Sequence, residues 1–460
     1  MDVMESARAS YQQKNNSNLD HIPGKYGTPI IANIAQARSN PFKLYDEQYK
    51  KYGSLSKITL FTRKGLLALG PDLAKQITLD KEKNFSNYMG YNFALKGLFD
   101  GGLLLHDFDD HRFHRRIMQT AFKNPALQGY TEVMNSSAPE FISQWDTEKP
   151  FVMFPAIKAL TLQIAARIFI GTHIGSDMDK MVAAFGDMLE ATIAIIRTNV
   201  PGTNFKFTKG VRAKNQLDAY FQSMLPEKRK GSGTDMMTYF CQELDENGQL
   251  FTDEAVCQHL RFLMLAAHDT TASALINTFY LLAAYPEWQT KIREEMLSIP
   301  SDVLSYDDMS KLPQLENVFM EVVRLYPPAP SVLRRTVRDC EMAGYHVPAN
   351  TVITLSAVYT HRMKEWWDEP LKFDPDRFAP PREEHKRHAY SWVPFGGGAH
   401  KCIGMHFALL LYKCIMFHAL RTYQFSLPAG YPMPGPTEEI NWSPIPKPKD
   451  GLTVIVKPLK

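Results

Sequence analysis

The most reactive residue in this sequence is a cysteine inside a glycine-rich stretch. Residues 395–404 read Phe-Gly-Gly-Gly-Ala-His-Lys-Cys-Ile-Gly, and an apolar run over residues 407–411 predicts that a helix follows. Consecutive glycines permit positive φ angles and a close approach to another surface. Because the N–H groups at a helix start favour a thiolate, Cys402 could ligate a haem iron. Alternatively, a lone cysteine can simply be a small apolar side chain buried in the core.

The spacing around this cysteine is shared with a known family. The pattern Phe395-x-x-Gly398-x-His400-x-Cys402-x-Gly404 resembles the haem-binding signature of the cytochrome P-450 family of haem-thiolate monooxygenases. The resemblance implies a mainly α fold with a small β-rich lobe, and haem b as the cofactor. It also implies Cys402 as the metal ligand, with Phe395 and His400 in the cofactor-binding loop.

A long helix is predicted over residues 255–284, which contain neither glycine nor proline. Asp269 and Thr270 lie in its apolar middle, where a carboxylate beside a hydroxyl is costly unless it serves a function. Thr270 could also simply donate to the Ala266 carbonyl, as threonines in helices do. The pair resembles the oxygen-activating motif of the family, which implies that Asp269 and Thr270 are catalytic. Ala267 stands where glycine is commoner, so its methyl group should narrow the oxygen pocket.

A second predicted helix contains two residues, four positions apart, that could bind an anion together. His111 and Arg115 are four residues apart and therefore share a helix face. A solvated charged helix is the alternative. The resemblance implies that both bind a haem propionate, with His111 standing where tryptophan is common; either side chain can donate an N–H. Arg334 falls where the family places another propionate-binding arginine.

Three charged residues are predicted to form a structural network. Glu321 and Arg324 lie three residues apart on a helix that begins at Pro313, and they match the Glu-x-x-Arg motif of the family. Arg377 supplies the third member that the resemblance implies. A solvated ion pair is the alternative, but the apolar neighbours of Glu321 and Arg324 favour a buried network.

The substrate pocket is predicted from the resemblance and from apolar residues near the implied haem. Residues 86–105 should form a mixed loop that folds over the haem, with Phe93 and Leu98 facing the substrate. Alternatively, this segment is an ordinary loop whose aromatic side chains pack against the core. Met264, Ala267 and Val332 complete the predicted pocket.

Composition excludes several function classes. A net charge of +3 over 460 residues is too small and too evenly spread to indicate nucleic-acid binding. Five cysteines without a CxxC pair favour reduced thiols in a cytoplasm. Residues 1–20 are polar and predict a flexible arm with no membrane anchor, followed by a single haem domain over residues 21–460.

These features together predict an enzyme that oxidises an apolar small molecule with O₂. Sterols, terpenoids and other lipids are the expected substrates. Electrons should come from a ferredoxin or similar donor with an NAD(P)H reductase. The donor is expected to dock near Lys401, Arg116, Lys413 and Arg421. Alternatively, these residues are only part of a generic basic surface. A peroxide-driven fatty-acid peroxygenase and a non-catalytic haem carrier or sensor are the alternatives; the retained Asp269-Thr270 pair speaks against the peroxygenase.

Overall fold

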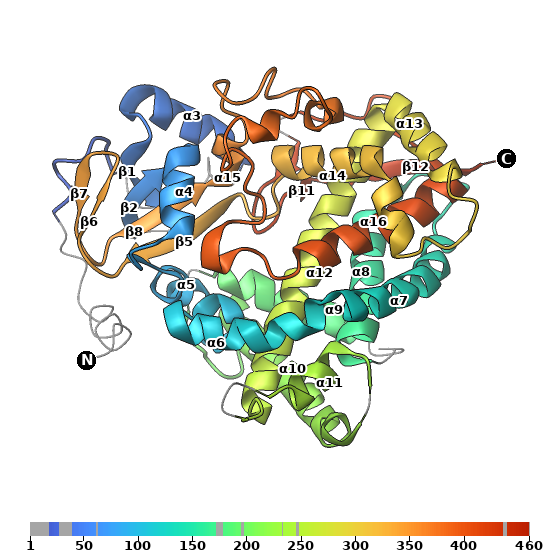
Figure 1. The fold of residues 1–460 in the computed structure, drawn as a ribbon, viewed down its shortest axis with the longest axis horizontal. Coiled ribbons are helices and arrows are strands. Elements are labelled where there is room, and N and C mark those ends of the chain that lie inside the picture. Colours follow the sequence, from blue (N-terminus) through green and yellow to red (C-terminus); the bar gives the residue numbers. More distant parts are fainter. Residues whose placement is uncertain are drawn as a thin grey trace.

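The chain folds into a large helical lobe and a smaller lobe of strands. The computed structural model describes residues 18–26, 39–60, 63–171, 178–194, 197–231, 233–244, 248–435 and 439–459. The predicted mainly α fold with a small β-rich lobe is confirmed (Figure 1). Residues 1–17 of the predicted arm lie outside the described residues, whereas Leu19 and Ile22 are buried in the core of the small lobe.

The α-helices form about half of the described chain. They are α3 (Pro41–Tyr52), α4 (Pro71–Leu79), α5 (Asn87–Leu95), α6 (Phe108–Met118), α7 (Asn124–Ile142), α8 (Phe154–Ile170), α9 (Met178–Thr192), α10 (Lys206–Lys230), α11 (Met236–Gln242), α12 (Asp253–Ala284), α13 (Pro286–Leu297), α14 (Pro313–Leu325), α15 (Ala357–Thr360) and α16 (Met405–Thr422).

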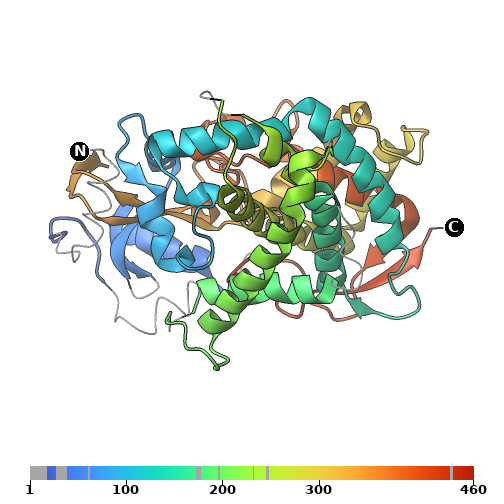
Figure 2. The same ribbon diagram turned by 90° about the horizontal axis from the view of Figure 1, so that it is seen from below.

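The strands make one five-stranded sheet and three smaller ones. They are β1 (Leu55–Leu60), β2 (Arg63–Ala68), β3 (Phe85–Ser86), β4 (Phe151–Val152), β5 (Ser331–Thr336), β6 (Cys340–Met342), β7 (Tyr345–Val347), β8 (Val352–Ser356), β9 (Tyr423–Ser426), β10 (Ile440–Asn441), β11 (Lys447–Pro448) and β12 (Thr453–Pro458). The large sheet has the order β1-β2-β8-β5-β3, and only β2 and β8 pair in parallel within it. This sheet lies at one end of the molecule and β12 lies at the other (Figure 2).

Helix α12 runs through the middle of the helical lobe (Figure 1). The Thr252 hydroxyl caps its start by accepting from the Ala255 N–H at 3.2 Å. Two acidic residues in the first turn suit the positive end of the helix. Most of its residues are buried, and it packs against α8, α10, α14 and α16. The predicted central helix is therefore present.

Residues 86–105 differ from the predicted mixed loop. Residues 87–95 form helix α5, because the Ser86 hydroxyl caps it by accepting from the Met89 N–H at 2.9 Å. The buried Asp107 carboxylate accepts from the Asn87 N–H at 2.7 Å and also bonds the Ser86 hydroxyl. These contacts satisfy the free N–H groups of the first turn of α5 and fix it beside α6.

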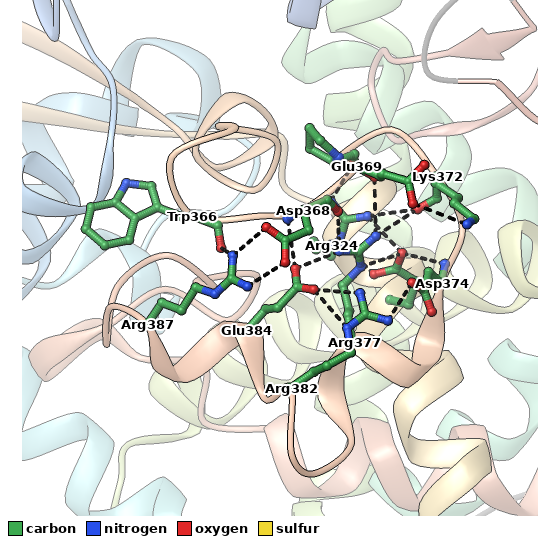
Figure 3. Close-up of polar contacts among 12 residues, drawn as sticks. Arg324, Trp366, Asp368, Glu369, Lys372, Asp374, Arg377, Arg382, Glu384 and Arg387 are labelled. Atoms are coloured by element: carbon green, nitrogen blue, oxygen red, sulfur yellow. Dashed lines mark hydrogen bonds and ion pairs between the residues drawn. The ribbon is translucent and has the colours of Figure 1, made fainter.

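The predicted charged residues meet in a fully buried network (Figure 3). Arg324 donates to both oxygens of Glu321, at 2.6 and 2.8 Å. Arg377 donates to Glu321 at 3.2 Å and to Glu384 at 2.7 Å. Sequence reasoning missed Glu384, which adds the second carboxylate, so two buried cations face two buried anions. This balance offsets the cost of removing the charges from water.

The network reaches the cysteine loop through His361. One Arg324 nitrogen donates to the backbone carbonyls of His361 and Pro370, each at 2.8 Å. The His361 ring accepts from the Val393 N–H at 2.9 Å. Because Val393 lies two residues before Phe395, the buried charges fix the backbone that leads into the glycine-rich stretch.

Replacing Arg324 with alanine should abolish stable folding. Removal of one partner leaves the Glu321 carboxylate buried and poorly compensated, which costs about 3–5 kcal/mol. That is a large fraction of a typical folding free energy. Urea unfolding and haem content should show an insoluble or haem-free protein.

Arg387→Ala is the matched control, since Arg387 pairs with Asp368 at the partly exposed edge of the same region. It should cost at most about 1 kcal/mol. Equal, small losses in both variants would contradict a structural role for the buried network.

Candidate functional site

The glycine-rich stretch forms a tight loop whose ends are joined by one hydrogen bond. The Cys402 N–H donates to the Phe395 carbonyl at 2.9 Å. Gly396 and Gly398 have φ angles of +67° and +61°, which residues with a Cβ rarely adopt. A Cβ at Gly398 would also overlap the Thr78 carbonyl at the end of α4. Glycine is therefore required at this position, both for its φ angle and for the close approach to α4.

Cys402 faces an internal cavity of about 340 Å³. The cavity is bounded by the cysteine loop, the middle of α12 and the segment that leads into β5. Its apolar lining residues include Leu103, Leu104, Phe262, Leu263, Ala266, Ala267, Val323, Pro328, Ala329, Val332, Phe395 and Phe407. The site therefore has mainly apolar walls around a single sulfur.

The electrostatic surroundings of the thiol differ from the prediction made from the helix start alone. Burial raises the pKa of Cys402, while the Gly404 N–H, Arg115 and Lys401 act in the opposite direction. Burial among the surrounding protein atoms is the largest of these influences, although the cysteine itself is exposed at the cavity surface. A metal cation deprotonates a thiol that coordinates it, so the thiolate form would depend on the bound metal.

One end of the cavity is basic. His111, Arg115, Arg334 and His400 all line it, and the His111 and His400 rings lie 3.8 Å apart between centroids. Burial and the Arg115 charge lower the pKa of His111 to about 4, and burial lowers that of His400 to about 2. Both imidazoles are therefore neutral near pH 7, and the two guanidinium groups carry the positive charge.

Asn87 was not predicted from the sequence, but it orients His400. Its side-chain amide donates to Nδ1 of His400 at 2.6 Å, which leaves the ring proton on Nε2. The position of Asn87 depends on Asp107, which binds its backbone N–H. The sequence signal for the helix that positions Asn87 was Ser86, a good N-cap residue directly before it.

The residues of this cavity fit a haem. Within the described chain, neither Arg115 nor Arg334 forms a direct ion pair, although both line the cavity and Arg334 is only 7% exposed; Asp80 and Asp107 act on Arg334 without contacting it in an ion pair. Burying a cation without a directly paired anion is expensive, so the basic end suits a ligand with acidic groups. Two propionates would supply them, the apolar walls would accept the porphyrin ring, and the Cys402 sulfur would suit its iron.

The predicted substrate residues separate into three groups. Ala267 and Val332 line the cavity. Phe93 lines a neighbouring hollow that shares Tyr91 with it. Leu98 and Met264 do not line the cavity, because both are fully buried in the core. Leu98 packs under α10, and Met264 lies two residues from Ala266, on another face of α12.

The two predicted catalytic residues lie on different sides of α12. Thr270 lines the cavity, and its hydroxyl donates to the Ala266 carbonyl at 2.5 Å. Asp269 does not line the cavity and is only 4% exposed. It pairs with Lys158 of α8 at 2.9 Å, and its second oxygen is buried without a hydrogen-bond partner.

The predicted basic docking residues are only partly at the surface. Lys401 and Arg116 are exposed, whereas Arg421 is half-buried and pairs with Asp302 at 3.1 Å. Lys413 is a correction to the predicted surface patch. It is buried because α16 is a core helix, and it donates to Glu316 at 2.6 Å and to the Met309 carbonyl at 2.8 Å.

One helical segment, Gly398–Thr422, is long and apolar enough to span a membrane by length and composition. Its most apolar 18-residue window is 61% buried inside the structure. That burial is typical of a core helix in a globular fold.

Comparison with known proteins decides the family. A family model described as Cytochrome P450 matches residues 22–450. The chain belongs to the cytochrome P450 family. It is therefore a cytochrome P450 monooxygenase, an oxidoreductase whose family implies a haem cofactor.

Relatives of this P450 cover nearly all of the chain. Putative cytochrome P450 136 of Mycobacterium tuberculosis is 38% identical over 448 residues, which span 96% of this chain and 89% of that protein. Beta-amyrin 28-monooxygenase of Kalopanax septemlobus is 28% identical over 464 residues, spanning 96% and 93%. The solved structure of retinoic acid bound cyanobacterial CYP120A1 has a TM-score of 0.85 at 24% identity, covering 95% and 99%, and so shares the fold.

The cysteine can be tested by spectroscopy of this P450. If Cys402 ligates the iron, the reduced carbon monoxide complex should absorb at the long-wavelength Soret position typical of thiolate-bound haem. Cys402→His should lose this band. Cys340→Ser, at a half-buried cysteine outside the cavity, should keep it. An unchanged spectrum in Cys402→His would exclude this cysteine as the ligand.

Proposed function

We propose that the cavity binds haem b through Cys402 and oxidises an apolar small molecule. The observation that supports this most strongly is the single cavity that contains the Cys402 sulfur, the unpaired Arg115 and Arg334 cations and the Thr270 hydroxyl. Haem bound there would supply iron that activates O₂ with two electrons. The chain supplies the ligand, the propionate partners, an apolar wall and a route for protons.

The substrate is a bulky isoprenoid lipid. Among relatives, beta-amyrin 28-monooxygenase and taxane 10-beta-hydroxylase carry names of terpenoid-oxidising enzymes. The cavity suits such a molecule because its walls beside α12 and β5 are built from alanine, valine, leucine, proline and phenylalanine. An apolar lining with few polar groups binds a ligand mainly through buried surface area.

Electrons come from a separate donor, a ferredoxin or similar protein with an NAD(P)H reductase. The exposed Lys401 and Arg116 lie next to cavity residues of the cysteine loop and α6, and so offer positive charge to an acidic partner. A cytoplasmic location fits the five free cysteines, which oxidising compartments would tend to pair.

Protons reach the cavity through two residues of α12. Thr270 holds a hydroxyl at the cavity wall, where it can position a water or pass on a proton. Asp269 holds its carboxylate on another side of the same helix, against the partly exposed Lys158 of α8. One Asp269 oxygen contacts the Lys158 ammonium, and the other is buried without a hydrogen-bond partner, so it can accept a hydrogen bond from a water that enters beside α12.

The first test is a lipid screen on the haem-loaded protein. Triterpenes, sterols, retinoids and fatty acids are added while the Soret band is followed, because an apolar ligand displaces water from the haem. An isoprenoid should give the largest shift and should be oxidised with NAD(P)H, ferredoxin and reductase, at about one product per NAD(P)H. Turnover with peroxide and fatty acids alone would indicate a peroxygenase. Binding without turnover under either condition would indicate a carrier or sensor.

Substitutions of Thr270 and Asp269 should impair the reaction in different ways. Thr270→Ala should still consume NAD(P)H but release mostly hydrogen peroxide, because the hydroxyl that positions the proton is missing. Asp269→Asn should slow NAD(P)H consumption, by about 10²–10⁴-fold, with a smaller peroxide fraction.

Thr278→Ala is the matched control for this pair. Thr278 also donates to a carbonyl four residues earlier, that of Ala274 at 2.8 Å, but it does not line the cavity. It should remain coupled. A fully coupled Thr270→Ala would show that this hydroxyl serves only its own helix.

A further inference from the structure

Three histidines meet beside the wall of the haem cavity, and the P450 chemistry above uses none of them. They are His106, directly after the short helix η1 (Leu103–Leu105), His114 of α6 and His259 of α12, here called the three-histidine cluster. One ring nitrogen from each lies within 4.8 Å of the other two. The His106 and His114 rings stack at 3.9 Å between centroids, and Nδ1 of His114 lies 2.8 Å from Nε2 of His259.

A carboxylate lies beside the cluster. Asp110, one turn before His114 in α6, has one oxygen 2.5 Å from Nδ1 of His106 and the other 3.6 Å from Nε2 of His114. A carboxylate that accepts the N–H of a histidine fixes the ring and makes its opposite nitrogen a better ligand. The Asp110 contact at 2.5 Å therefore orients the ring of His106. Nε2 of His106 donates to the Gly101 carbonyl at 2.9 Å, so it must release this proton before it can bind a metal.

The geometry of the cluster requires at least one free lone pair. Because Nδ1 of His114 lies 2.8 Å from Nε2 of His259, one of these nitrogens donates its N–H and the other accepts with its lone pair. His259 is fully buried, and its Nδ1 has no hydrogen-bond partner. Two rings that share one N–H···N contact in a buried site leave ligating capacity unused.

We propose that the three-histidine cluster is a binding site for one divalent transition-metal ion of the zinc type, with Asp110 orienting His106. Zinc binds imidazole nitrogen at about 2.0–2.1 Å in a tetrahedron, which places neighbouring nitrogens about 3.3 Å apart. The 2.8 Å pair of His114 and His259 must open by about half an ångström, and His106 must exchange the Gly101 carbonyl for the metal. Three nitrogens and one open position make a known type of zinc coordination.

The ion would connect three segments that line the haem cavity. Leu104 precedes His106, Arg115 follows His114, and Phe262 lies one turn after His259. Metal binding to preassembled ligands stabilises the folded state. The site therefore acts as a clamp on the wall that holds the basic end of the cavity. Access is from the side of Asp110, whose side chain is 40% exposed, while Phe251 covers the opposite faces of His114 and His259.

The test uses tag-free, haem-loaded protein dialysed against buffered Zn²⁺, with metal content measured by mass spectrometry. The wild type should bind one zinc per chain and should gain thermal stability with zinc. His106→Gln and His114→Gln should each weaken zinc binding at least about 100-fold, and Asp110→Asn about 10- to 100-fold. The double variant His21→Gln/His346→Gln removes another adjacent histidine pair, at the surface, and should bind zinc as the wild type does.

A wild type that binds no more zinc than His114→Gln would overturn the proposal. If the glutamine variants fail to fold, zinc X-ray absorption of the wild type decides the question without them. Three imidazole nitrogens around the zinc would support the site, and one or two would overturn it.

Discussion

The buried pairing of Glu321 with Arg324 and Arg377 is the constraint on which the rest of the site depends. Its charges are fully removed from water, so the network is stable only when every member is present. Its guanidinium groups also bind backbone carbonyls of the irregular segment that precedes the cysteine loop. A segment with little regular structure of its own is thereby held rigid, and the sulfur at its end has a defined position.

In contrast to the buried network, the cavity contains positive charges without direct ion-pair partners among the described residues. Arg115 and Arg334 are brought to its basic end without ion-pair partners in the described chain, and His111 and His400 are kept neutral by burial. The fold accepts this cost at the site that is proposed to bind haem, an apolar ligand with acidic groups. Unfavourable charge placement of this kind is common at functional sites, where binding and not folding sets the requirement.

Local sequence patterns predicted the parts of the site that depend on neighbours in the chain. The glycine-rich loop, the long helix around Thr270 and the Glu321–Arg324 spacing could all be found this way. Glu384, Asn87 and the three-histidine cluster could not, because each acquires its role from residues distant in sequence. The direction of some side chains could not be predicted from local patterns either. Lys413 faces the core, and Asp269 points away from the cavity that Thr270 lines.

The order of the cavity residues along the chain has a consequence for biosynthesis. The lining residues extend from Thr78 to Ala408, and the sulfur ligand proposed for the iron is residue 402 of 460. At about 5–20 residues per second, a ribosome needs about 16–65 s to extend the chain from Thr78 to Cys402. The haem cavity cannot close until Cys402 and Ala408 have been added, so cofactor capture must follow the synthesis of these residues. The supply of haem at that stage would then limit the yield of active enzyme.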